Sequence, residues 1–85
     1  MPYITQGKRN RIDPYLEQIN EIIYEKGELT YCLYKLCSLY LKTRRISYET
    51  LSTTMSCLED AKLEWHRKRM IPYEDKKIRE NGDIE

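Results

Sequence analysis

The most constraining feature of the sequence is an apolar stripe between residues 29 and 41. Its members recur at the i, i+3, i+4, i+7 spacing that gathers side chains on one face of an α-helix. Tyr31 and Tyr34 widen this face and are the predicted interface residues on it. We therefore expect a helix over residues 28–42 with a face that must be covered. The stripe consists of Leu29, Cys32, Leu33, Leu36, Cys37, Tyr40 and Leu41.

A second helix is predicted before this stripe. Asp13 can accept hydrogen bonds from free backbone N–H groups, and Pro14 fits the first helical position. Gly27 is typical of a helix end because glycine accepts the left-handed conformation. The predicted helix covers residues 14–26 and presents Leu16, Ile19, Ile22 and Ile23 as its apolar face.

A third helix is predicted after Ser47, a suitable N-cap residue. It extends to Met70, because Pro72 disfavours helical geometry in the residue before it. Short connections between helices favour antiparallel neighbours. The sequence therefore predicts an all-α fold in one domain of residues 1–85, a three-helix bundle formed by residues 14–26, 28–42 and 48–70.

The two ends of the chain carry weaker patterns. Residues 1–12 lack helical periodicity and predict an extended arm. Residues 72–85 are highly charged, and they predict a short helix or a tail that docks through Tyr73 and Ile78. A loose, solvated tail is the alternative that composition alone favours.

Charge and cysteine usage exclude several classes of protein. Fifteen basic and fourteen acidic side chains nearly cancel, whereas a general nucleic-acid binder carries a large basic excess. Three Cys without a predicted signal peptide indicate reduced thiols, and hence a cytoplasmic location. No stretch is apolar enough to predict a membrane span.

No catalytic or metal-binding motif is recognisable. His66 is the single His and the Cys residues lack CxxC spacing, so neither a metal site nor a cofactor is predicted. Cys57 and His66 would lie about 13 Å apart along one helix and cannot act together within one chain. The acidic residues on helices lack the paired spacing of magnesium-dependent hydrolases. The sequence therefore predicts a protein that is not an enzyme.

Three basic clusters are the candidate binding residues. Arg suits bidentate contacts to phosphate, and aromatic rings stack on nucleobases. If the clusters converge, within a chain or between subunits, they would form an anion-binding cleft; solvated surface charge is the alternative. The candidate ligand-binding residues are Tyr3, Lys8, Arg9, Arg11, Arg44, Arg45, Arg67, Arg69 and Tyr73.

Several motifs are distinctive: the opening MPYI, the run LEDAKLE at residues 58–64, and above all PYEDKKI and ENGDI between residues 72 and 84. In these motifs the chain resembles a family of small proteins encoded by tailed phages and prophages. Asp60, Trp65 and His66 depart from the family pattern. The resemblance implies a phage setting in the host cytoplasm and no established activity.

Three functions follow as hypotheses. The first is a homo-oligomeric phage protein that counters host defence by sequestering an anionic, nucleotide-type signal molecule. The second is a protein-interaction module that inhibits or adapts a host or phage protein. The third, a nucleic-acid accessory factor, is disfavoured by the near-neutral charge.

Overall fold

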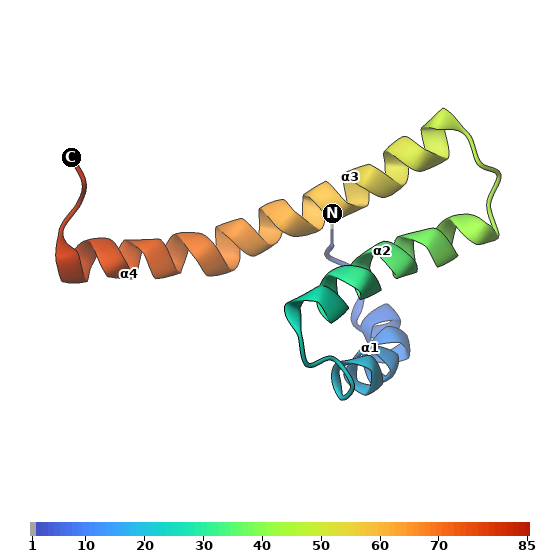
Figure 1. The fold of residues 1–85 in the computed structure, drawn as a ribbon, viewed down its shortest axis with the longest axis horizontal. Helices are drawn as coiled ribbons and strands as arrows, with labels where there is room; N and C mark the ends of the chain where they lie inside the picture. Colours follow the sequence, from blue (N-terminus) through green and yellow to red (C-terminus); the bar gives the residue numbers. More distant parts are fainter. Residues whose placement is uncertain (1) are drawn as a thin grey trace. The chain divides into compact units, whose positions relative to one another are not determined.

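The computed structural model describes residues 2–85, and every regular element in that range is helical, which confirms the all-α class. The chain divides into two compact units. We call residues 3–54 the amino-terminal unit, and residues 55–85 together with Pro2 the carboxyl-terminal unit. The elements, in order, are α1 (Gln6–Asn20), α2 (Lys26–Lys42), α3 (Tyr48–Trp65), a π-helical turn η1 (His66–Met70) and α4 (Ile71–Asn81) (Figure 1).

Helix α1 begins eight residues before the predicted start at Pro14 and ends at Asn20. Thr5 caps it by accepting a hydrogen bond from the Lys8 N–H at 3.4 Å. The predicted arm over residues 1–12 is therefore wrong beyond residue 5, and its first residue lies outside the described ones. Pro14 lies inside the helix, where it removes one backbone hydrogen bond. The cap at Thr5 starts the helix upstream of Pro14, and the helix continues through the proline with the loss of that one bond.

Helix α2 confirms the helix predicted from the apolar stripe. Its amino end is fixed by Glu28, whose Oε1 accepts hydrogen bonds from the backbone N–H of Glu25 at 2.7 Å and of Tyr24 at 3.1 Å. These two bonds satisfy backbone N–H groups that the start of a helix leaves without a partner in the helix. Gly27 lies in the first turn of α2, so its predicted role as the end of the preceding helix is wrong.

Helix α3 begins as the sequence predicts. Thr50 Oγ1 accepts from the Ser47 N–H at 2.9 Å, and the Thr50 N–H donates to Ser47 Oγ at 3.2 Å. One turn later, Thr54 donates its hydroxyl to the Thr50 carbonyl at 2.8 Å. This pairing confirms Ser47 as the residue that starts the helix.

Pro72 interrupts the helical ladder without ending the helix. It lacks an N–H, and its ring crowds the carbonyl four residues earlier. The ladder widens there, and the Ile71 N–H bonds to the His66 carbonyl five residues back. Helix α4 then continues to Asn81, and Gly82 takes a left-handed φ of 86° after it. Residues 71–81 thus form the predicted short helix, while its docking stays a prediction.

Neither unit, taken by itself, contains a closed apolar core. Among residues 2–85, Thr54 is the one buried residue, with 7% of its surface exposed, and no apolar side chain is buried. On α2, Leu33 is 50% exposed although it belongs to the most apolar stripe of the chain. The bundle arrangement therefore stays a prediction, and the apolar face of α2 is one that needs a further surface to cover it.

Candidate functional site

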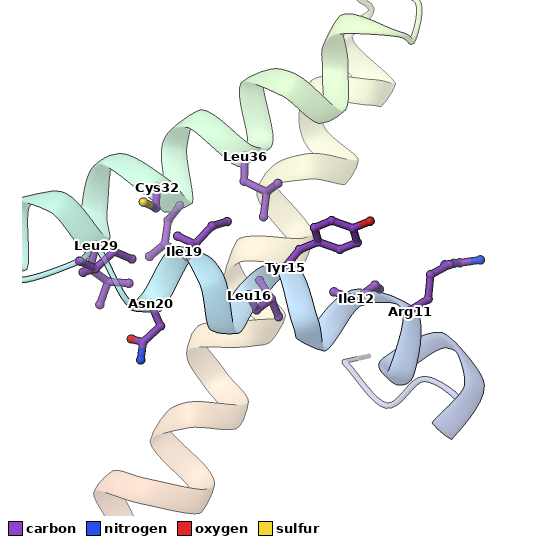
Figure 2. A pocket seen from close by; sticks show the side chains of 11 residues that line it. Arg11, Ile12, Tyr15, Leu16, Ile19, Asn20, Leu29, Cys32 and Leu36 are labelled. Carbon is purple, nitrogen blue, oxygen red and sulfur yellow. The ribbon is translucent and has the colours of Figure 1, made fainter.

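The amino-terminal unit carries an apolar groove between α1 and α2. The groove has a volume of about 580 Å³. Figure 2 shows Tyr15 of α1 and Leu36 of α2 on its facing sides, with Ile19 and Cys32 further along toward the turn. Arg11 is the one charged side chain of this lining. An apolar lining of this kind suits the apolar side chains of a partner.

The sequence predicts the α1 side of this groove in part: Leu16, Ile19 and Ile23 belong to the predicted apolar face, and Ile12 does not. Ile12, Leu16, Ile19 and Ile23 follow the spacing of one helical face, and all four line the groove. Placing Ile12 in an arm hid the start of that pattern. A search for periodicity that ignored Pro14 would have found it.

A second candidate site is the amino end of α1. Lys8, Arg9 and Arg11 lie in its first two turns, and the first turn contains no acidic residue. Tyr3 precedes the helix and is exposed. The positive end of the helix dipole and the free N–H groups favour an anion here. These three cations were predicted in an extended arm, and the structure has them at the start of a helix.

Arg44 and Arg45 follow α2, at the end away from the α1–α2 turn. The Arg44 guanidinium lies 3.5 Å from the centre of the Tyr40 ring and donates to the Tyr40 carbonyl at 2.6 Å. Arg44 therefore caps the negative end of its own helix, as the sequence suggests for cations there. The Arg45 carbonyl accepts from Thr50 Oγ1 at 2.9 Å.

The remaining candidate ligand residues belong to the carboxyl-terminal unit, where they make local contacts. Arg67 Nε donates to Glu64 at 2.9 Å. Arg69 lies 5.5 Å from the centre of the Trp65 ring, and Lys77 lies 5.6 Å from that of Tyr73. The structure brings Lys8, Arg9 and Arg11 together on one helix, but it places Arg67, Arg69 and Tyr73 in a different unit.

The predicted interface residues are accessible. Tyr34 is 77% exposed, and Tyr31 is exposed beside it on α2. Ile78 is exposed on α4. An aromatic ring that keeps this much surface in contact with water is available for an interface.

The chain matches, over residues 1–84, the family described as Domain of unknown function (DUF6899). It belongs to this family. No curated protein and no solved structure matches the chain. Two features of this DUF6899 protein therefore bear on its function: the groove and the basic amino end of α1.

Within residues 2–85, no three His, Cys, Asp or Glu side chains are placed to hold a metal ion. Cys32, Cys37 and Cys57 are not in disulfides. No helix of the described range is long and apolar enough to cross a membrane.

Proposed function

We propose that this DUF6899 protein is a non-enzymatic, homo-oligomeric binding protein. Its ligand is an anion of the nucleotide type, held at the basic amino end of α1. In the phage setting that the sequence resemblance implies, such a protein would counter host defence by sequestering a nucleotide signal in the host cytoplasm.

The observation that carries this proposal is the start of α1 at Gln6. With this start, Lys8, Arg9 and Arg11 belong to the first two turns of α1, where the positive end of the helix dipole also favours an anion. Arg offers a bidentate fork to phosphate, and Lys adds a compact charge. The exposed ring of Tyr3 is a stacking surface for a base.

Isothermal titration against cyclic dinucleotides and ADP-ribose-type nucleotides tests this proposal. Charge-assisted hydrogen bonds contribute about 1.5–3 kcal/mol each, so Arg9→Gln or Arg11→Gln should weaken binding about tenfold or more. Lys76→Gln removes the same charge from α4 and should leave binding unchanged. The proposal fails if no ligand of the panel binds, or if the α1 variants bind as the unaltered protein does.

Exposed aromatic residues in the carboxyl-terminal unit favour a second function, a protein-interaction module that inhibits or adapts a host or phage protein. Trp65 is 62% exposed, and Leu63 and Tyr73 are also exposed. Trp and Tyr dominate the binding energy of protein interfaces. Pull-down from host lysate should then recover a stoichiometric partner that Trp65→Ala loses. Recovery that is independent of Trp65 would count against this surface.

A further inference from the structure

We propose that a second copy of this chain covers the α1–α2 groove, and that the two copies pair in antiparallel orientation about a two-fold axis. In this arrangement, the α1–α2 turn of each copy faces the free ends of α1 and α2 of the other. The inference deepens the homo-oligomeric part of the proposed function by assigning its surface and its orientation. It does not require the nucleotide ligand.

The groove exposes apolar side chains to water, which is energetically unfavourable. Leu29 and Leu36 project from α2 toward α1, yet half or more of each side chain is exposed (Figure 2). The rest of α2 is apolar over much of its circumference, which is typical of a helix packed on several sides. A further apolar surface is therefore needed along the length of α2, and a single small ligand would not cover it.

The charges of α1 and α2, which together form a helical hairpin, favour a second copy as the occupant. The end of this hairpin opposite its turn, called its free ends here, comprises residues 3–13 and 36–46 and has a net charge of +5. Its turn end, residues 14–35, has a net charge of −2. The free ends carry Lys8, Arg9, Arg11, Lys42, Arg44 and Arg45 against Asp13, and the turn end carries Glu17, Glu21, Glu25 and Glu28 against Lys26 and Lys35.

This separation of charge makes the hairpin complementary to itself in one direction only. Parallel pairing would place two basic ends together, and like charges across an interface suppress association. Antiparallel pairing places the acidic turn of one copy against the basic ends of the other, and two-fold symmetry repeats the contact. A second copy supplies the matching length, apolar stripe and complementary charge at once.

Pairing and anion binding both involve the same three cations. The turn of the second copy approaches Lys8, Arg9 and Arg11, which the proposed function assigns to the anion. A saturating anion should therefore lower the pairing affinity. Pairing is measured without nucleotide, so a failure of the pairing and a failure of the anion site are separate results.

Sedimentation equilibrium of the full chain with two reversed-charge variants tests the inference. One variant combines Lys8→Glu with Arg11→Glu, and the other combines Glu21→Lys with Glu25→Lys. Each alone should pair at least tenfold more weakly than the unaltered chain, and an equimolar mixture should restore pairing as a mixed dimer. Far-UV circular dichroism checks that both variants stay helical.

A matched control has the same charge change elsewhere. Lys76→Glu with Lys77→Glu reverses two cations of α4 and should pair like the unaltered chain. Carbodiimide cross-linking between a labelled and an unlabelled copy should join Lys8 of one to Glu25 or Glu28 of the other. A strictly monomeric unaltered chain, a mixture that stays monomeric, or equal loss in the control overturns the inference. A monomer would leave the groove to a different protein.

Discussion

The two units of this chain are helical for different reasons. The amino-terminal unit is rich in apolar side chains that form a groove, and its charges are separated between two ends. The carboxyl-terminal unit alternates acids and bases along a helix and is held by contacts three or four residues apart. The first therefore depends on burial against another surface, whereas the second depends mainly on its own backbone ladder.

This difference distinguishes the groove, where two copies are proposed to pair, from the helix of the carboxyl-terminal unit. Burial of apolar area contributes far more free energy than exposed ion pairs do. Substitutions in the amino-terminal unit should thus change stability and association together. Substitutions in the carboxyl-terminal unit should change local helicity and leave the pairing of two copies unchanged.

The largest effect is expected from Leu33→Ala compared with Leu63→Ala. The two side chains are 50% and 54% exposed within the chain, so they are matched in that respect. If a second copy covers the groove, Leu33→Ala leaves a cavity and should cost about 2–4 kcal/mol of stability. Leu63→Ala should cost under about 1 kcal/mol, as exposed substitutions do.

Urea denaturation at two protein concentrations measures both costs, because only an oligomer is stabilised by raising the concentration. The midpoint of the unaltered protein and of Leu63→Ala should rise with concentration. That of Leu33→Ala should rise less. Equal costs for the two variants would show that the groove is uncovered in solution.

The next effect concerns the π-helical turn. Pro72→Ala supplies an N–H that can bond to the Lys68 carbonyl, so the regular α-helical ladder should extend from α3 into α4. A Pro inside a helix costs about 3 kcal/mol, part of which the π turn already recovers, so we expect a gain of about 1–2 kcal/mol. Far-UV circular dichroism should show higher helicity and a higher melting temperature.

Pro2→Ala is the control, because Pro2 lies outside every helix. It should leave the melting temperature unchanged. A loss of helicity in Pro72→Ala would instead mean that the proline stabilises the π turn.

A smaller effect is expected at the start of α2. Glu28→Ala removes the acceptor of the Tyr24 and Glu25 N–H groups and should cost about 1 kcal/mol. Glu49→Ala also removes an acid from the first turn of a helix, but it should cost about 0.5 kcal/mol or less through the helix dipole alone. Thermal denaturation ranks the two. A cost at Glu49 that equals that at Glu28 would argue against capping.

Local signals in the sequence predicted most of the helices. The stripe from Leu29 to Leu41 predicts α2, and Ser47 predicts the start of α3, because each acts within a few residues. Pro14 misled, since a proline suits the first turn of a helix but α1 contains it in the interior. The cap at Thr5 sets the start of α1 instead, eight residues before the boundary that Pro14 suggests.

The candidate site was predicted only in part, for a similar reason. Lys8, Arg9 and Arg11 are adjacent in the sequence, so their grouping could be read directly. The groove joins Ile12 and Tyr15 to Leu33 and Leu36, about twenty residues away, and is defined only by the packing of α1 beside α2. A hydrophobic pattern predicts which face of a helix is buried, but it does not predict which other element or molecule covers that face.

The smallest effect is expected in α4, at Glu80. Its carboxylate lies 3.2 Å from Lys77 Nζ and 3.9 Å from Lys76 Nζ, and all three side chains are well exposed. Exposed pairs of this spacing contribute about 0.2–0.5 kcal/mol, and added salt weakens them. Glu80→Gln should therefore lower the melting temperature slightly at low salt and have almost no effect at high salt. Because α4 lies outside the groove, sedimentation should show unchanged pairing; weaker pairing would mean that the carboxyl-terminal unit also contributes to the interface.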